Sequence, residues 1–121
     1  SRFLGNTQLL ESQSRNQYER LAKIFSYIDN NLYRNLRVDD LAEVMCLSSD
    51  HFTRVFKQVS GMSPNQYVQA KRIERAQTLL LASRLSIKEI AETVGIPNLS
   101  QFSKLFIKHT GYTPREYKNT L

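Results

Sequence analysis

The chain has 121 residues, 40% hydrophobic and 23% charged, which suits one ordinary globular domain or two very small ones rather than a disordered tail. No apolar run approaches the roughly 18 residues needed to span a bilayer, so no transmembrane segment is expected. The 17 Lys and Arg residues outnumber the 11 Asp and Glu residues, giving a formal net charge of +6. This excess favours an anionic partner, either nucleic acid or a membrane surface.

The positive charge is concentrated in the second half of the chain. Residues 1–50 hold six basic and seven acidic side chains, whereas residues 51–121 hold eleven basic and four acidic ones. The single cysteine, Cys46, excludes an internal disulfide and fits a reducing, cytoplasmic compartment. The chain begins with Ser1 and shows no signal-peptide pattern, so we expect a fragment of a longer protein.

The first predicted elements precede residue 36. Residues 1–16 are polar, and we expect them to be irregular, the remnant of a linker. A first helix is expected from about Gln17 to Leu32, because apolar residues recur there at helical spacing. Its predicted buried face consists of Leu21, Ile24, Phe25 and Ile28.

From residue 36 onward, one pattern occurs twice. Residues 36–43 align with residues 85–92 at an offset of 49, and after one inserted residue the offset becomes 50. The pairs at the second offset are Phe52 and Phe102, Arg54 and Lys104, Phe56 and Phe106, Gly61 and Gly111, Pro64 and Pro114, and Tyr67 and Tyr117. The chain therefore contains one structural unit twice.

Each unit is predicted to be a short helix, a tight turn and a second helix. The first helices carry the amphipathic stripes Val38, Leu41, Ala42, Met45 and Ile87, Ile90, Ala91, Val94. The turns fall at Cys46-Leu47 and at Gly95-Ile96-Pro97, where glycine suits a left-handed position and cysteine adopts it at some cost. The second helices start at Ser48 or Ser49 and at Asn98, and end at Gly61 and Gly111. Their predicted buried residues are Phe52, Val55, Phe56, Val59 and Phe102, Leu105, Phe106.

A long bridging helix is predicted from about Pro64 to Ala82. Its predicted buried residues are Tyr67, Ile73, Ala76, Leu79 and Leu80, and its basic flank is Lys71, Arg72 and Arg75. Capping boxes are expected at Ser63 with Gln66, Ser86 with Glu89, and Thr113 with Glu116. No stretch alternates with period 2 for long enough to propose a strand, so the predicted fold is all-α, about seven helices. It divides into a linker remnant (1–16), a first helix-turn-helix unit with the bridge (17–82) and a second unit (83–121).

A helix, a short turn and a second helix form the plan of a DNA-reading helix-turn-helix. Because the second helix buries its apolar face, its other face is free to enter a major groove. The candidate base-reading residues are Ser49, Asp50, Thr53, Arg54, Ser100, Gln101, Ser103 and Lys104. Arg54 is suited to guanine, and Asp50 can accept from cytosine. The candidate phosphate contacts are Ser48, Lys57, Lys71, Arg72, Asn98 and Lys108.

Residues 36–121 resemble the DNA-binding domain of AraC/XylS-type bacterial transcription regulators. The motif is Arg72-Ile73-x-x-Ala76-x-x-x-Leu80, Ile87-x-x-Ile90-Ala91, Gly95-Ile96, Phe102-x-x-x-Phe106 and Gly111-x-x-Pro114. The resemblance implies two units on a rigid bridge that bind two successive major grooves as one monomer. The family's base-facing positions fall on Ser49, Asp50, Thr53, Arg54, Leu99, Ser100, Ser103 and Lys104. The chain departs from the pattern at Cys46, where glycine is usual, and at Pro97-Asn98-Leu99 in place of polar residues.

The resemblance also implies partners and a setting. These are promoter or operator DNA in the bacterial nucleoid, RNA polymerase contacted during activation, and a separate regulatory domain for which this chain has no room. Recognition helices on one rigid bridge should lie about 34 Å apart to meet adjacent grooves, and a shorter separation requires bent DNA. The expected DNA site is asymmetric, with two different half-motifs.

Three other classes of function fit the sequence less well. An enzyme is disfavoured because no catalytic arrangement, metal-ligand spacing or cofactor motif is legible, and His51 and His109 lie in different units. We expect His51 to be exposed on a recognition helix and His109 to complement a helix end. A helical protein- or RNA-interaction module is the main alternative, although the phenylalanines of the two units have core spacing rather than a stacking arrangement. Membrane-surface binding lacks an exposed apolar stripe.

Overall fold

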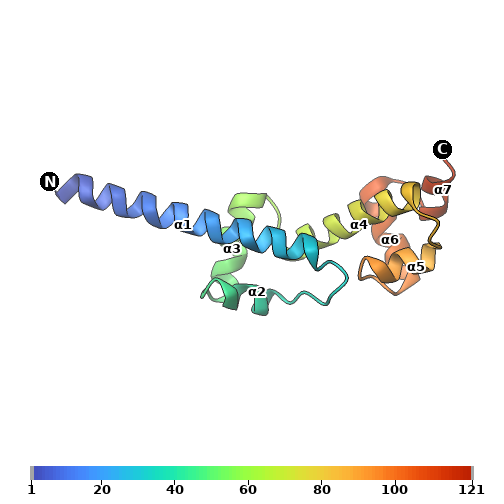
Figure 1. Cartoon of the computed structure of the whole chain (residues 1–121), viewed down its shortest axis with the longest axis horizontal. Helices are drawn as coiled ribbons and strands as arrows, with labels where there is room; N and C mark the ends of the chain where they lie inside the picture. The colour runs from blue at the N-terminus through green and yellow to red at the C-terminus, as the bar shows by residue number, and fades with distance from the viewer. Residues whose placement is uncertain (1, 121) are drawn as a thin grey trace.

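The computed structural model describes residues 2–120, with side chains described from Arg15 to Thr120. The helices are α1 (Arg2–Asn30), α2 (Val38–Val44), α3 (Ser49–Ser60), α4 (Pro64–Ala82), α5 (Ile87–Thr93), α6 (Leu99–Thr110) and α7 (Pro114–Lys118). There is no strand in this part of the chain, and the predicted all-α fold of about seven helices is confirmed. Figure 1 shows α4 running from a group formed with α1, α2 and α3 to a group formed with α5, α6 and α7.

The prediction that residues 1–16 are irregular is wrong for the described residues 2–16, which form the first half of α1. The helix ends at Asn30 rather than Leu32, and Asn31 turns the chain by donating from its backbone N–H to the carbonyl of Ile28. Residues 2–16 contain no proline, and a polar segment of this kind extends a helix whose later turns are held by packing. Their role as a linker stays a prediction.

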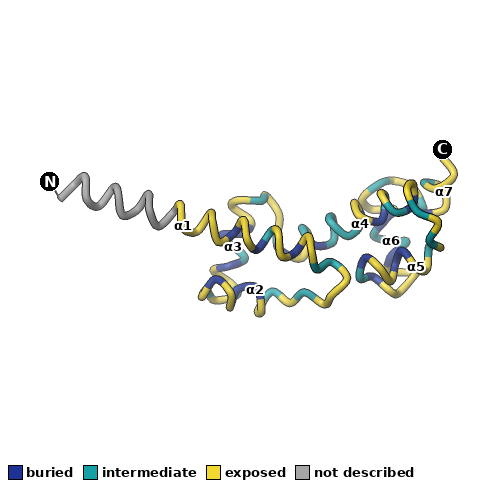
Figure 2. The backbone as a smooth tube through the Cα atoms, in the orientation of Figure 1, coloured by how far each residue is buried: buried dark blue, intermediate teal, exposed yellow. Residues whose placement is uncertain are grey.

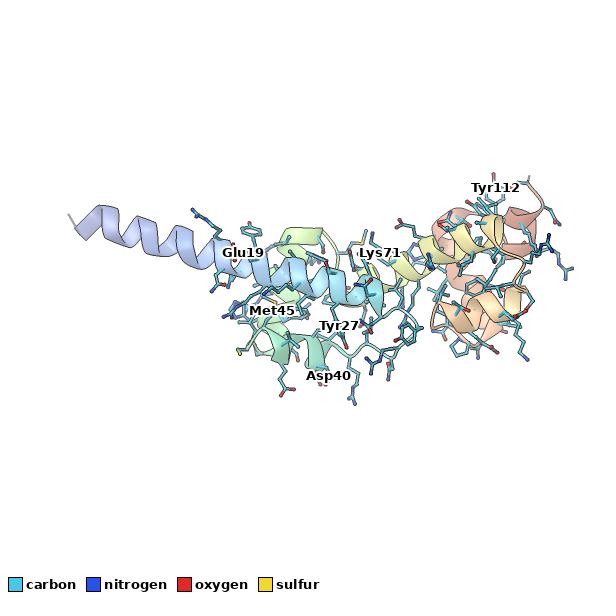
Figure 3. All side chains as sticks on the ribbon, viewed as in Figure 1. Glu19, Tyr27, Asp40, Met45, Lys71 and Tyr112 are labelled. Carbon is cyan, nitrogen blue, oxygen red and sulfur yellow. The ribbon has the colours of Figure 1, made fainter. Side chains whose placement is uncertain are left out.

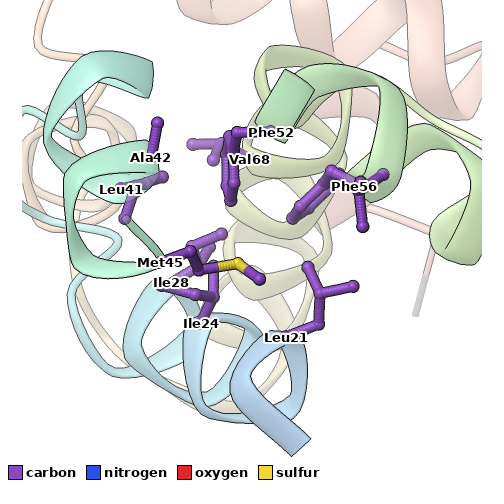
Figure 4. Close-up of a cluster of buried hydrophobic side chains, with 10 residues drawn as sticks. Leu21, Ile24, Ile28, Leu41, Ala42, Met45, Phe52, Phe56 and Val68 are labelled. Atoms are coloured by element: carbon purple, nitrogen blue, oxygen red, sulfur yellow. The ribbon is translucent and has the colours of Figure 1, made fainter. Parts of the chain in front are cut away.

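Each unit has its own hydrophobic core, and α4 contributes to both (Figure 2). In core one, α4 contributes Val68, and in core two it contributes Ile73, Ala76 and Leu80. The other members of core one, most of them labelled in Figure 4, are Leu21, Ile24, Ile28, Leu41, Ala42, Met45, Phe52, Val55 and Phe56. Those of core two are Ile90, Ala91, Val94, Ile96, Phe102 and Phe106.

Most of the predicted buried residues are confirmed, with one clear exception. Partly buried side chains packed against the cores include Phe25, Val38, Tyr67, Leu79, Ile87 and Leu105. The prediction that Val59 is buried is wrong, because 39% of the side chain is exposed near the end of α3. The second unit has no apolar counterpart there, since the matching position is His109.

The backbone conformation and hydrogen bonds of the turn are the same in the two units, in agreement with the repeat in the sequence. The N–H of Leu47 donates to the carbonyl of Ala42 at 3.0 Å, and that of Ile96 donates to Ala91 at 2.9 Å. Cys46 and Gly95 occupy the same turn position with φ of 57° and 84°, so the left-handed conformation predicted there is confirmed. The N-terminal caps are Ser48 for α3 and Asn98 for α6, at an offset of 50. Because Leu47 and Ile96 still match at an offset of 49, Pro97 is the residue inserted in the second unit.

The aromatic packing repeats as well. The rings of Phe56 and Tyr67 meet edge-on with centroids 5.4 Å apart, and those of Phe106 and Tyr117 do so at 5.5 Å. Gly61 and Gly111 end α3 and α6 in the left-handed conformation, as predicted. The helices α3 and α6 are therefore held by the same contacts, each within its own unit.

Two of the three predicted capping boxes are complete. Ser63 with Gln66, and Ser86 with Glu89, each make both reciprocal hydrogen bonds. At the start of α7 the Thr113 hydroxyl accepts from the N–H of Glu116, but no bond returns from the Glu116 side chain to the Thr113 N–H. The third box is therefore half formed.

We expect Ser86→Ala to destabilise the second unit by about 1 kcal/mol, the usual cost of losing such a cap. Hydrogen bonds from the backbone and side chain of Ser86 hold the pKa of Glu89 below its ordinary value. The stabilisation linked to this carboxylate is therefore present above the ordinary glutamate pKa and is lost as the pH falls through the lowered value. In the variant, the pKa of Glu89 should rise, as measured by NMR titration alongside urea denaturation.

The matched control is Ser63→Ala, which removes an equivalent cap whose partner Gln66 does not titrate. It should cost a similar free energy of unfolding with no change in the acid-side pH dependence. An unchanged pKa of Glu89 in Ser86→Ala would contradict this prediction.

Candidate nucleic-acid interface

The helix α3 separates its apolar and polar residues onto opposite faces. Phe52, Val55 and Phe56 are buried in core one. The predicted base-reading residues Asp50 and Arg54 are exposed, Ser49 and Thr53 are half-buried, and Lys57 is exposed near the end of the helix. The structure therefore brings the predicted residues of unit one together along one helix.

The helix α6 repeats this arrangement. Phe102 and Phe106 are buried in core two, whereas Ser100, Gln101 and Lys104 are exposed and Ser103 is half-buried. Lys108 is exposed in the last turn, one turn beyond Lys104. Arg54 and Lys104 thus occupy equivalent positions on equivalent faces, each able to donate hydrogen bonds outward.

The start of the recognition helix differs between the units. In unit one the Ser49 hydroxyl donates to the carboxylate of Asp39 on α2, while the Ser48 hydroxyl accepts from the N–H of His51. The positions in unit two that match Ser49 and Asp39 hold Leu99 and Lys88. Leu99 is 43% exposed, so this end of α6 offers an apolar contact where α3 offers a carboxylate-bound hydroxyl. The two faces are therefore chemically distinct.

The predicted basic flank of α4 does not form one continuous surface. Lys71, labelled in Figure 3, has its Nζ 3.6 Å from a carboxylate oxygen of Glu74 and 5.5 Å from the ring centre of Tyr67. The pKa of Lys71 is raised, chiefly by the phenolic group of Tyr67 and also by Glu74. Arg75 is exposed.

Arg72 is turned toward the protein rather than outward. Its Nε donates to the carbonyl of Leu32 at 3.0 Å, and its Nη2 donates to the carbonyl of Arg34 at 2.7 Å. Burial lowers the pKa of the guanidinium, although arginine stays charged at neutral pH. Because these donors are engaged by the segment after α1, we leave Arg72 out of the proposed phosphate contacts. Sequence reasoning missed this bracing role.

The remaining candidates for other chemistry are dispersed. His51 and His109 are both exposed, and they lie on α3 and α6. Within residues 15–120, no group of three or more His, Cys, Asp or Glu side chains is placed to hold a metal ion. Among the helices that the structure describes, none carries an apolar run of the length that a membrane span requires.

Known proteins of similar sequence and structure place the chain in a family. A family model described as a helix-turn-helix domain matches residues 41–120. An uncharacterised helix-turn-helix-type transcriptional regulator of Bacillus subtilis, YobQ, is 34% identical over 96 residues, which are 79% of this chain and 40% of that protein. The chain thus spans less than half the length of this relative.

Two solved structures have the same fold. An AraC-type transcriptional regulator from Chromobacterium violaceum has a TM-score of 0.77 and 30% identity, over 86% of this chain and 93% of that one. The DNA-binding domain of AdpA, a global transcriptional factor solved with a target DNA, has a TM-score of 0.78 and 28% identity, over 81% and 88% of the two chains. This chain belongs to the helix-turn-helix domain family of the AraC-type transcription regulators.

Proposed function

We propose that this chain binds specific sequences of double-stranded DNA and regulates bacterial transcription, with α3 and α6 each entering one of two successive major grooves. The observation that carries the proposal is the duplicated polar face of α3 and α6, set by two equivalent cores. AdpA, whose DNA-binding domain shares this fold, was solved with its target DNA, which supports duplex DNA as the ligand.

The base-reading roles are assigned by exposure and by hydrogen-bonding capacity. Arg54 donates two hydrogen bonds to guanine, and Lys104 donates to guanine less rigidly. Asp50 accepts from cytosine, and Ser49, although it donates to Asp39, keeps lone pairs to accept. The remaining base contacts come from the exposed Ser100 and Gln101 and from the half-buried Thr53 and Ser103, all on the same two faces.

The phosphate contacts flank these faces. Ser48 and Asn98 cap α3 and α6, so they place helix N-terminal N–H groups toward the DNA backbone. Lys57, Lys108 and Lys71 supply sequence-independent charge. Because the reading faces differ, the DNA site is asymmetric. Two half-motifs about 34 Å apart meet one face of the duplex, or the DNA bends at a cost of a few kcal/mol.

Further parts of the proposal concern the whole protein. A regulatory domain outside this chain, contact with RNA polymerase and an activating role agree with the family and with the longer relatives. A cytoplasmic, nucleoid location follows from binding chromosomal DNA. No catalytic function is assigned to these residues.

An RNA-binding module would present aromatic rings for base stacking on its binding face. The phenylalanines of α3 and α6 are fully buried. The most exposed aromatic side chains of residues 15–120 are Tyr18, Tyr27, Tyr33 and Tyr112, and none of them lies on α3 or α6. The exposed faces of these two helices therefore suit a groove edge better than unstacked bases.

Selection of bound sequences from random duplex DNA tests the proposal. We expect one asymmetric motif with two conserved half-motifs separated by about one helical turn. Single-stranded RNA of matched length is the control ligand and should bind more weakly. Recovery of no motif, or preference for the RNA, would overturn the proposed function.

A further inference from the structure

We propose that a three-part junction formed by Gly95, Arg72 and the carbonyl of Leu32 fixes the second unit against the first, and so sets the half-site spacing that the chain accepts. The inference rests on the proposed function, because spacing has meaning only for a two-part DNA site. It assigns positioning roles to two residues outside the reading faces.

The junction joins three parts of the fold. Arg72 lies on α4, between Val68 in core one and Ile73 in core two. Its guanidinium donates to the carbonyls of Leu32 and Arg34, in the segment between α1 and α2. In Figure 1 this segment reaches toward α5. One side chain of the bridge therefore holds the segment between α1 and α2 close to the second unit.

Gly95 completes the contact from the second unit. A Cβ atom built on Gly95 would lie 2.3 Å from the carbonyl oxygen of Leu32 and 3.2 Å from both the Nε and the Cζ of Arg72. The first distance is too short for any side chain, and the Leu32 oxygen belongs to the backbone, so it cannot rotate away. The turn between α5 and α6 thus packs directly on the same carbonyl that Arg72 holds.

The repeat provides an internal comparison that separates two reasons for a glycine. The equivalent turn position in unit one is Cys46, which has φ of 57° and an exposed side chain. The turn itself therefore tolerates a side chain in the left-handed conformation. The requirement for glycine at residue 95 comes from the neighbouring unit and not from the turn alone.

This contact matters because it joins the two units at a point outside α4, the helix whose side chains pack in both cores. The cores share no buried residue, and each is closed within its own unit. Linking two DNA-binding units raises the overall affinity only when both units can bind their half-sites at the same time. A second point of contact beside the bridging helix fixes the rotation of α6 relative to α3, and hence the spacing at which both engage.

The test compares Gly95→Ala with Gly61→Ala. Both glycines have positive φ, of 84° and 78°, but a Cβ at Gly61 meets nothing within 4 Å, so only Gly95→Ala disturbs the junction. A third variant, Arg72→Gln, removes the guanidinium without changing the turn. Each protein is titrated with duplexes carrying the selected half-motifs at a series of spacings, and with each half-motif alone.

Gly95→Ala and Arg72→Gln should shift or broaden the spacing optimum and weaken binding at the wild-type spacing by about tenfold to a hundredfold, with the half-motif affinities unchanged. Gly61→Ala should keep the wild-type optimum. If both junction variants keep that optimum, the inference is overturned. Should Gly95→Ala fail to fold by circular dichroism, the result for Arg72→Gln decides.

A measurement without DNA distinguishes this inference from the proposed function. Nitroxide labels on the exposed Cys46 and on Arg115→Cys report the distance between the units by pulsed electron spin resonance. The distance distribution should shift or widen in Gly95→Ala and Arg72→Gln but not in Gly61→Ala. An unchanged distribution in the junction variants overturns the inference. A wild-type protein that selects no DNA motif overturns the proposed function and with it the role in half-site spacing, but it leaves the junction between the units in place.

Discussion

Replacing Phe106 by alanine is expected to unfold the second unit while the first unit stays folded. Phe106 is fully buried, and its ring lies 5.9 Å from that of Phe102 and 5.5 Å from that of Tyr117, measured between centroids. Truncating a buried phenylalanine costs about 3–5 kcal/mol. A unit of this size buries little apolar surface, so a loss of that order removes most of its stability.

The separate cores explain why the effect should be local. Core one contains no residue beyond Val68, so it does not depend on the contacts of Phe106. Hydrogen exchange read by mass spectrometry should show lost protection in α5, α6 and α7, with α2 and α3 still protected. Ile107→Ala is the control, because its side chain is 44% exposed on the same helix and its loss should cost little. Uniform loss of protection across the chain would contradict the prediction.

The parts of the fold that the sequence predicts best are those fixed by local pattern. The apolar stripes, the turn at Cys46 and the helix stops at Gly61 and Gly111 depend on residues only a few positions apart. Sequence reasoning misses the start of α1 because a polar segment gives no clear apolar stripe, although no proline interrupts it. The burial of Val59 was overpredicted, since residue type alone does not show where a core ends.

In the candidate site, too, local pattern predicts some features, and long-range contacts determine others. The faces of α3 and α6 follow from helical spacing, because the residues opposite a buried stripe are exposed. The role of Arg72 depends on backbone carbonyls 38 and 40 residues away in sequence, and a carbonyl leaves no trace in residue identity. The left-handed turn is a sufficient reason for glycine at residue 95, so the sequence gives no sign that Gly95 also contacts the carbonyl of Leu32. Long-range contacts of this kind require the three-dimensional structure.

Arg54→Ala is expected to weaken binding to the selected DNA site by about 1–3 kcal/mol while barely changing binding to random DNA. The side chain is exposed on the polar face of α3, opposite the buried Phe52 and Phe56. A guanidinium there is able to donate two parallel hydrogen bonds to the O6 and N7 atoms of one guanine, a contact that other base pairs do not satisfy. The loss should be confined to one base position of one half-motif.

The control is Lys57→Ala, about one turn further along the same helix and also exposed. As a phosphate contact it should weaken specific and random DNA alike, and reduce the slope of log affinity against log salt by about one. Fluorescence anisotropy titrations at several salt concentrations separate the two behaviours. If Arg54→Ala lowers the affinity for both DNAs equally and flattens the salt dependence, Arg54 is a phosphate contact, and base discrimination by unit one then depends on Asp50 and Thr53.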